Sequence, residues 1–489
     1  MRIRLAVDPA RARMWHRRLA DELRRRGHGV SIVTHPGRTS PPAAISLILT
    51  LERLAYRQPD GTPGSPWTRR DLAAYAQGPM DGTPDLIVDL TGGSDPHAGV
   101  RTLRPVYADA FIEEAAISEL LSNRMPLIGV ADSAASDRPE LFHAAIERPR
   151  TLCKALDNLG ARLATIFVGA IERIARNETV AGKSAIALHD ATTWPKIGAL
   201  DTLVARARTA LTSLSMKPPH WFVGWRPADH DRLAETMRLP QAGWHRLPDD
   251  GARFYADPFV LRHEGRTWLF VEEFPYATGK AIVSVVEMGP EGPLGTPRPI
   301  LERANHLSYP FVFERAGAIW MIPETSTAGR VELFHATKFP DAWESVGPLV
   351  DGIEVSDATI VEHEGRLWMF GAVGGEGASS WDALHLWHAD ELVGPWLPHS
   401  GNPILIDARG ARPAGAFYRR AGELWRPAQD CTSGYGAALA LARVTRLDTE
   451  GFAQEVASVI RPGGAWPGIG LHTLNWAAGI EVVDGCVDR

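Results

Sequence analysis

The chain has 489 residues, 45% of them hydrophobic and 22% charged, with a net charge of −6. This length exceeds one ordinary hydrophobic core, so we expect two or three domains, and the charge gives no reason to expect nucleic-acid binding. The three cysteines, Cys153, Cys431 and Cys486, show neither the spacing of a zinc site nor an even disulfide framework. We predict no bound metal and no cofactor.

The sequence also lacks the apolar segments that direct a chain to or across a membrane. No run of about 18 apolar residues is present, so no stable membrane span is predicted. The chain opens on a strand-like run, Ile3 to Val7, and not on the basic and then apolar pattern of a secretory signal. A cytoplasmic location is the resulting expectation, and the oligomeric state stays open.

Residues 1–137 have the pattern of an α/β, Rossmann-like domain. The helical stretch 10–27 carries Trp15, Leu19 and Leu23 on one face and arginines around the rest. With a strand on either side it forms a β-α-β unit, which is typical of a parallel sheet. The predicted strands are residues 3–7, 30–33, 85–90 and 126–130, and a second helix is predicted at 112–121.

A glycine turn, Thr91-Gly92-Gly93-Ser94, follows the third strand. A phosphate cradle would fit there, but no Gly-x-Gly-x-x-Gly or P-loop lysine accompanies it, so a plain turn is favoured. Because ligands bind at the carboxyl edge of open α/β sheets, a pocket near Thr91 and Asp132 is also considered.

The opening strand-helix-strand and the run Asp85-Leu-Ile-Val-Asp-Leu-Thr-Gly92 resemble the Rossmann-like half of the formyltransferase family. The resemblance covers about the first 130 residues and implies that fold. The family's Asn, His and Asp catalytic set has no counterpart after this strand, where residues 104–111 contain no histidine. We therefore expect the fold without formyl transfer.

A helical connector is predicted over residues 138–218. Apolar residues recur at helical spacing from Leu152 to Ile171 and again from Val204 to Leu214. The prolines of Lys217-Pro-Pro-His220 mark its end. The run that follows, His220 to Trp225, reads as a strand placed to complete the last blade of a ring.

One short sequence motif is repeated in residues 219–489: a glycine, two residues, a tryptophan and an apolar pair. Four copies contain Gly265/Trp268, Gly317/Trp320, Gly365/Trp368 and Gly422/Trp425, and a weaker fifth copy begins at Gly479. The glycines are 52, 48, 57 and 57 residues apart. A β-rich repeat near 50 residues indicates propeller blades, so we predict an all-β, five-bladed propeller.

Each copy is preceded by a strand-like run that opens on a polar residue. In a propeller these runs line the central axis, so the polar residues would converge at one mouth. Further acids follow the tryptophan strands, and of the adjacent Glu272 and Glu273 we favour Glu273 as the one facing the axis. The candidate catalytic residues are Asp257, Asp357 and Glu324, and the candidate substrate-binding residues are Glu273, His306, Tyr309, Arg412, Asp430 and His472.

Two family resemblances accompany these residues. The phrase Ala256-Asp257-Pro258 resembles the first blade of five-bladed furanosidase-type glycoside hydrolases, which implies a base or nucleophile role for Asp257. That group's second-blade Asp-Pro is Tyr309-Pro310 here. Residues 220–480 more closely resemble the N-terminal propeller domain of glucosamine inositolphosphorylceramide transferases. The shared phrases are His306–Phe313, Pro323-Glu324, Ser356–Thr359 and Gln429–Cys431.

We therefore predict a carbohydrate-active enzyme that acts at a glycosidic bond, by glycosyl transfer or hydrolysis. Paired carboxylates supply the acid and the base or nucleophile for such chemistry. The substrate would be a sugar or glycoconjugate, with a nucleotide sugar as one candidate donor. The alternative is a non-catalytic propeller that binds a glycan or glycolipid. Glu324 and Asp430 could instead accept hydrogen bonds from buried backbone between blades, and Asp257 could cap a strand turn.

Overall fold

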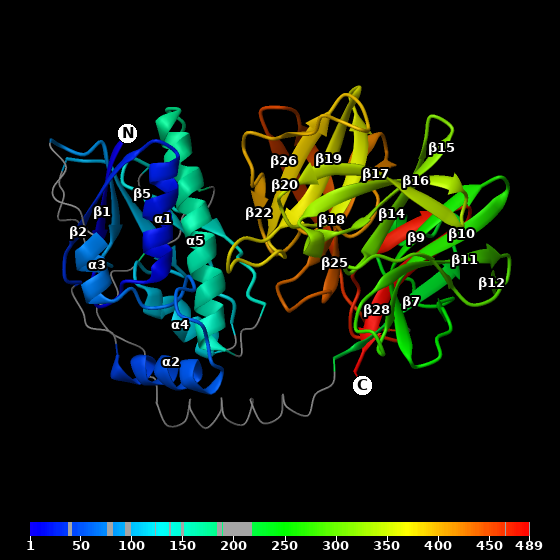
Figure 1. The fold of residues 1–489 in the computed structure, drawn as a ribbon, viewed down its shortest axis with the longest axis horizontal. Coiled ribbons are helices and arrows are strands. Elements are labelled where there is room, and N and C mark those ends of the chain that lie inside the picture. Colours follow the sequence, from blue (N-terminus) through cyan, green and yellow to red (C-terminus); the bar gives the residue numbers. More distant parts are fainter. Residues whose placement is uncertain are drawn as a thin grey trace. The chain divides into compact units, whose positions relative to one another are not determined.

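Figure 1 shows the computed structural model, which describes residues 1–37, 42–75, 82–92, 99–122, 124–135, 138–147, 151–182, 188, 218–464 and 466–488. The chain divides into two compact units. The first unit holds Met1–Ser215 with Gly375–Ser379, and the second holds Met216–Gly374 with Ser380–Arg489.

The first unit is built on a six-stranded mixed sheet, in the order β2-β1-β3-β4-β5-β6. Its strands are β1 (Arg2–Val7), β2 (Gly29–Thr34), β3 (Leu86–Leu90), β4 (Thr102–Tyr107), β5 (Ile128–Asp132) and β6 (Glu140–Phe142). The first four pair in parallel, and β5 and β6 pair antiparallel. Helices and parallel strands agree with the predicted α/β class, while the formyltransferase-like identity stays a prediction.

The helices bury one face each. They are α1 (Met14–Arg25), α2 (Ala43–Ala55), α3 (Arg69–Tyr75), α4 (Glu113–Leu121) and α5 (Leu152–Ala175). Trp15, Leu19 and Leu23 of α1 are buried as the sequence predicts. A Cβ at Gly160 of α5 would lie 2.7 Å from the Trp15 ring, so this glycine permits close packing of α1 on α5. Among the described residues no helix is long and apolar enough to cross a membrane.

The predicted connector is only partly described. Residues 152–171 form most of α5, which packs on α1 and so belongs to the first unit. Residues 204–214 lie outside the described part of the chain.

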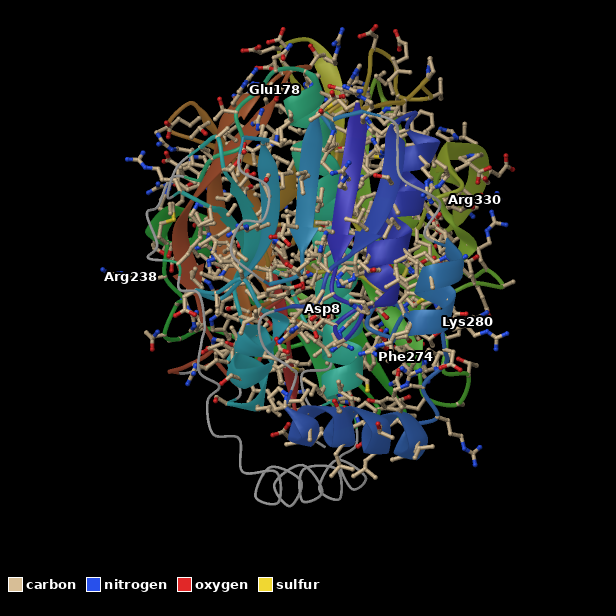
Figure 2. The ribbon with its side chains drawn as sticks, turned by 90° about the vertical axis from the view of Figure 1, so that its left-hand side faces the viewer. Asp8, Glu178, Arg238, Phe274, Lys280 and Arg330 are labelled. Atoms are coloured by element: carbon tan, nitrogen blue, oxygen red, sulfur yellow. The ribbon has the colours of Figure 1, made fainter. Side chains whose placement is uncertain are left out.

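The carboxyl edge of the parallel strands carries buried charges. Asp8, labelled in Figure 2, follows β1, and its carboxylate pairs with Arg11 at 2.7 Å. The Arg11 guanidinium also pairs with Glu114 at 2.9 Å. The Thr91 hydroxyl at this edge donates to Asp89 at 2.6 Å. The prediction of one pocket near Thr91 and Asp132 is wrong. Because β5 runs antiparallel to β4, Asp132 lies opposite Leu103, near the start of β4 and away from the carboxyl edge that holds Thr91.

The second unit is a five-bladed β-propeller, as predicted. Blade 1 contains β9 (Arg253–His263), β10 (Arg266–Pro275), β11 (Ile282–Gly289), β12 (Gly292–Pro293) and β13 (Arg298–Leu301), and blade 2 contains β14 (Ser308–Arg315), β15 (Ala318–Glu324), β16 (Arg330–Lys338) and β17 (Ala342–Asp351). Blade 3 contains β18 (Val355–His363), β19 (Arg366–Val373), β20 (Ala383–Ala389), β21 (Leu397–Pro398) and β22 (Leu405–Ile406), and blade 4 contains β23 (Tyr418–Arg420), β24 (Glu423–Asp430), β25 (Ala438–Leu447) and β26 (Phe452–Ile460). Blade 5 contains β27 (Leu474–Ala477), β28 (Ile480–Val487), β7 (His220–Pro227) and β8 (His245–Arg246).

The repeated glycine is the second residue of the turn between the first two strands of each blade. All five turns place a non-glycine residue and then the glycine at positive φ, for example Glu264 at 47° and Gly265 at 77°. The fifth copy does the same at Ala478 and Gly479. Two successive positive φ angles suit the right-handed twist of a tight hairpin and favour glycine.

The ring closes between the two ends of the propeller chain. Strand β7, the first of this unit, pairs antiparallel with β28, the last, from His220–Val487 to Pro227–Ile480. This confirms the prediction that the run from His220 completes the last blade. Figure 1 shows the same juxtaposition of green β7 and red β28.

Candidate functional site

The first strands of blades 1, 2 and 3 share an unusual backbone feature. Asp257, Tyr309 and Asp357 each lie eight residues before the turn glycine and have φ angles of 49°, 43° and 55°. Each lies at a β-bulge, where the register with the second strand shifts. A non-glycine residue with positive φ is uncommon, and a bulge redirects its side chain.

Carboxylates hold the backbone N–H groups of these three residues. Asp484 accepts from Asp257 N–H at 2.8 Å, Asp257 accepts from Tyr309 N–H at 3.0 Å, and Glu324 accepts from Asp357 N–H at 3.0 Å. These bonds link blade 5 to 1, 1 to 2 and 2 to 3. They satisfy buried donors that the bulges remove from the sheet ladder.

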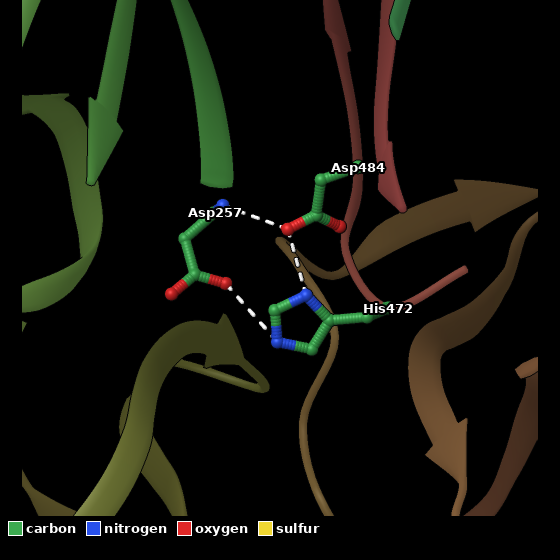
Figure 3. Close-up of side chains that lie close together, drawn as sticks. All are labelled: Asp257, His472 and Asp484. Carbon is green, nitrogen blue, oxygen red and sulfur yellow. Dashed lines mark hydrogen bonds and ion pairs between the residues drawn. The ribbon is translucent and has the colours of Figure 1, made fainter. Parts of the chain in front are cut away.

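We call Asp257, Glu324, Asp357, Arg412, His472 and Asp484 the central cluster. Its first half is the trio in Figure 3, in which the His472 imidazole lies between two carboxylates. Nδ1 is 2.7 Å from Asp484, and Nε2 is 3.4 Å from Asp257. Burial lowers the pKa of His472, but Asp484 and Asp257 outweigh it and raise that pKa to about 9. The imidazole is therefore a cation at neutral pH.

The second half of the cluster is an ion-paired carboxyl group. Arg412 Nε lies 2.6 Å from the Asp357 carboxylate, and Arg412 also lies 3.7 Å from Glu324. Burial raises the pKa of Asp357, Arg412 opposes the shift, and Glu324 adds to it, so the pKa reaches about 7. Burial also raises the pKa of Asp257 well above its usual range, against the opposing charge of His472. Two carboxyls that favour the protonated form thus lie in one cluster.

The structure brings six of the nine predicted site residues together or to the margin of the cluster. Asp257, Glu324, Asp357, Arg412 and His472 are within it. His306 lies 3.4 Å from Glu272, and its pKa is raised because Glu272 and Glu324 outweigh the lowering effect of burial. Glu272 in turn adds to the raised pKa of Asp257, which places the Glu272–His306 pair at the margin.

Three of the predicted residues have other contacts. Tyr309 is fully buried, and its hydroxyl bonds Thr359 at 2.9 Å and accepts from Gly415 N–H at 2.7 Å, so it joins blades 2, 3 and 4 and leaves no surface for substrate. Glu273 pairs with Arg253 and accepts from the Ser284 hydroxyl at 2.6 Å, within its own blade. Asp430 accepts from Thr432 N–H at 3.0 Å and so stabilises a turn.

For both Glu273 and Asp430, the preceding residue of the same strand is the one that reaches the cluster or its margin. Side chains alternate along a strand, so the neighbours Glu272 and Gln429 face the other way. Gln429 reaches Asp357 at 3.4 Å, as Glu272 reaches His306. Glu272, Glu324 and Gln429 all stand four residues after the repeat tryptophan. A search for polar residues four positions after each repeat tryptophan would have identified these three residues from the sequence.

Asp484 and Tyr435 are the residues that sequence reasoning missed. Asp484 follows the fifth copy of the repeat, where Val482 replaces the tryptophan, so no pattern marks it. The Tyr435 hydroxyl lies 2.8 Å from His472 Nε2. Tyr435 belongs to a loop between β24 and β25, outside every repeated phrase.

The His472 trio also has the composition of a metal site. In the described residues the ligand atoms of Asp257, His472 and Asp484 lie within 4.8 Å of one another. Hydrogen bonds already occupy these atoms, however: His472 Nδ1 bonds Asp484, His472 Nε2 bonds the Tyr435 hydroxyl, and Asp257 accepts from the Thr473 hydroxyl. A protonated imidazole also offers no lone pair to a metal. The donor set therefore fits a hydrogen-bonded array, with an imidazolium between two carboxyl groups, better than a metal centre.

Comparison with known proteins locates a relationship in the propeller. Residues 247–478 match the family profile of glucosamine inositolphosphorylceramide transferase 1, N-terminal. The Arabidopsis thaliana protein named glucosamine inositolphosphorylceramide transferase 1 is 33% identical over 248 residues, covering 48% of this chain and 32% of that protein. The Oryza sativa subsp. japonica protein of the same name is 30% identical over 251 residues, covering 48% and 33%. The match thus spans about a third of these relatives.

Solved structures similar to this chain include glycoside hydrolases. A family 117 enzyme from Zobellia galactanivorans shows 13% identity and a TM-score of 0.35, covering 55% of this chain and 90% of that one. A family 43 protein from Bacillus licheniformis shows 18% identity and a TM-score of 0.34, covering 48% and 51%. The five-bladed assignment rests on the strand pairing described above.

Proposed function

We propose that the propeller is a carbohydrate-active catalytic module that acts at a glycosidic bond, by transfer or by hydrolysis. The observation that carries the proposal is the pair of buried carboxyls, Asp257 and Asp357, whose pKa values are both raised. Reaction at an anomeric carbon uses one carboxyl to protonate the leaving oxygen and a second as base or nucleophile. The name of the matched relatives, glucosamine inositolphosphorylceramide transferase, supports a carbohydrate substrate.

Asp357 is the proposed acid. With a pKa of about 7 it holds a proton in about half of the molecules at neutral pH, which suits general acid catalysis. Glu324 keeps this pKa high by repulsion, and Arg412 limits the rise. Both side chains therefore tune the acid.

Asp257 is the proposed base or nucleophile. Burial favours its neutral form, so this role needs groups that stabilise the carboxylate. The His472 imidazolium, Tyr309 N–H and the Thr473 hydroxyl, which lies 3.0 Å from Asp257, supply them. His472 thus acts as a positioning and charge-stabilising residue.

A non-catalytic glycan-binding propeller is the second candidate. It is favoured by one observation: Asp257, Glu324 and Asp484 each accept a backbone N–H from a neighbouring strand. Such bonds stabilise the blades and require no chemistry.

A turnover screen separates the two candidates. Wild type, Asp257→Asn and Asp357→Asn are assayed on aryl glycosides, and on nucleotide sugars with glycolipid head groups as acceptors. The control is Asp351→Asn, an exposed carboxylate on β17. We expect each cluster variant to lose turnover by about 10²–10⁴-fold and the control to retain it. Binding without turnover in every folded variant would refute the enzyme and leave the binding module.

A further inference from the structure

Three aromatic side chains from separate segments meet beside the central cluster, and the proposed chemistry does not use them. Trp221 lies on β7, Trp381 lies between β19 and β20, and Tyr435 lies between β24 and β25. The Tyr435 ring is 5.6 Å from Trp381 and 5.9 Å from Trp221, between ring centroids. We call these three residues the aromatic triad.

The triad forms an outer layer over the two cations of the cluster. The Arg412 guanidinium lies 5.1 Å from the centroid of the Tyr435 ring, and the Trp221 ring lies 4.7 Å from that of His472. Tyr435 is 37% exposed, whereas Arg412 is 6% and His472 3% exposed. The triad therefore lies between solvent and the buried carboxyls, and a substrate would meet it first.

The backbone is shaped to hold Tyr435 in this position. Gly434 and Gly436, on either side of it, have φ angles of 127° and 62°. A Cβ at Gly436 would lie 2.5 Å from the Trp221 ring and 3.2 Å from His472 Cβ. Only glycine combines this backbone conformation with so close an approach.

The charges around the triad limit what can bind there. Arg412 is paired with Asp357 at 2.6 Å, and His472 is paired with Asp484 at 2.7 Å. Because both cations already pair with buried acidic groups, a phosphate or carboxylate on the ligand would bring a further negative charge to this cluster and gain little. A neutral ligand with an apolar face and polar edges fits the aromatic surface and the hydroxyl and imidazole groups beside it.

We propose that the aromatic triad is a sugar-binding subsite, which holds the C–H face of a neutral pyranose ring against Tyr435 and Trp381. The inference rests on the proposed function, since the bound ring would be one of the two groups joined by the glycosidic bond. It adds the class of that group: an uncharged sugar ring in preference to a phosphorylated or acidic one.

Isothermal titration of the full chain with three uncharged glycosides, methyl β-D-glucopyranoside, methyl β-D-galactopyranoside and methyl N-acetyl-β-D-glucosaminide, tests the subsite. Glucuronic acid and glucose 6-phosphate are the acidic comparators. Tyr435→Ala and Trp381→Ala should each raise the Kd for the neutral glycoside by about tenfold, whereas Tyr435→Phe should stay within about threefold. Tyr56→Ala, at an exposed tyrosine of the first unit, is the matched control.

The results are read against circular dichroism, which shows that each variant is folded. Tighter binding of the acidic sugars, no binding of any neutral glycoside at about 50 mM, or an unchanged Kd in both alanine variants would overturn the subsite. Asp357→Asn keeps the two proposals distinguishable. Triad-dependent binding without any Asp357-dependent turnover would refute only the enzyme, and Asp357-dependent turnover that ignores the triad would refute only the subsite.

Discussion

Each unit contains a deeply buried histidine with a shifted pKa, and the shifts at His16 and His472 have opposite directions. His16 of the first unit accepts the backbone N–H of Arg13 at 3.3 Å, and burial together with the Arg13 charge lowers its pKa to about 3. His472 of the propeller is equally buried, yet Asp484 and Asp257 raise its pKa to about 9. Burial alone makes a histidine neutral, and only paired carboxylates reverse this.

The comparison shows what the propeller maintains at its centre. In the first unit the largely buried side chain of Arg11 pairs with Asp8 and Glu114, and His16 stays uncharged. In the propeller the carboxylates of the central cluster are balanced by Arg412, by a protonated histidine and by protons on the carboxyls themselves. Buried groups with strongly shifted pKa values cluster at functional sites, so the central cluster is a candidate catalytic site.

The largest expected effect comes from removing the arginine of the cluster. Arg412→Met leaves Asp357 and Glu324 without their cation, so we expect a loss of about 3–5 kcal/mol in the free energy of unfolding. Arg409→Met, which breaks a partly exposed pair with Asp407, should cost about 0–1 kcal/mol. Urea unfolding measures both. Equal losses would show that the cluster is no more charge-dependent than the surface.

The next effect is a pair of opposite pH dependences. Because the folded-state pKa of His472 is raised, its contribution to stability is complete below pH 6.5 and lost as the pH rises through about 9. The lowered pKa of His16 gives the reverse: stability present above pH 6.5 is lost as the pH falls towards about 3. The shift at His472 corresponds to on the order of 3 kcal/mol.

Urea unfolding followed by hydrogen exchange and mass spectrometry reads the two units separately. His472→Gln should remove the loss of propeller stability between pH 6.5 and 9, and His16→Gln should flatten the acid loss in the first unit. The contrast between the two histidines would be refuted if both variants changed the stability of the same unit. It would also be refuted if both changed stability only above, or only below, neutral pH.

A smaller effect tests the support of the aromatic triad. Gly436→Ala combines a positive φ with a contact of 2.5 Å to Trp221, so the loop must shift, at a cost of about 1–3 kcal/mol. Gly434→Ala meets no atom within 4 Å and is the matched control. We expect Gly436→Ala to weaken binding of neutral glycosides more than Gly434→Ala does. Equal affinities of the two variants in titration would show that Gly436 does not support the aromatic triad.

At Tyr309 we expect an effect on stability with little effect on turnover. Tyr309→Phe removes the bonds to Thr359 and Gly415 N–H, so we expect about 1–3 kcal/mol lower stability with turnover nearly unchanged. Thermal unfolding and the turnover assay are the two readouts. A loss of turnover without a loss of stability would restore Tyr309 to the substrate-binding set.

Most of the propeller could be predicted because glycine turns are specified locally. Each repeat glycine has a positive φ angle in a tight turn, and glycine favours that conformation. The recurring glycines therefore predicted the number of blades and their spacing. The direction of β5 was not, because an apolar run does not reveal whether its neighbour is parallel. That ambiguity placed Asp132 at the wrong edge of the sheet.

The residues of the candidate site could be predicted where they belong to a repeated sequence motif. Asp257, Asp357 and Glu324 occupy repeat positions and meet in the structure, while Asp484 follows a copy without its tryptophan. Glu273 and Asp430 lie beside Glu272 and Gln429, which reach the margin and the cluster, since strand alternation determines the face of a side chain and acid content does not. Tyr435 depends on a non-repeating loop, which only tertiary structure places beside His472.

The most direct test of the account is the titration of the Asp357 carboxyl, followed by ¹³C NMR of aspartate-labelled protein and assigned by its absence in Asp357→Asn. We expect a carboxyl resonance that titrates near pH 7, because burial and Glu324 outweigh Arg412. A resonance that titrates near pH 4, as an ordinary aspartate does, would contradict a proton-holding acid in the cluster.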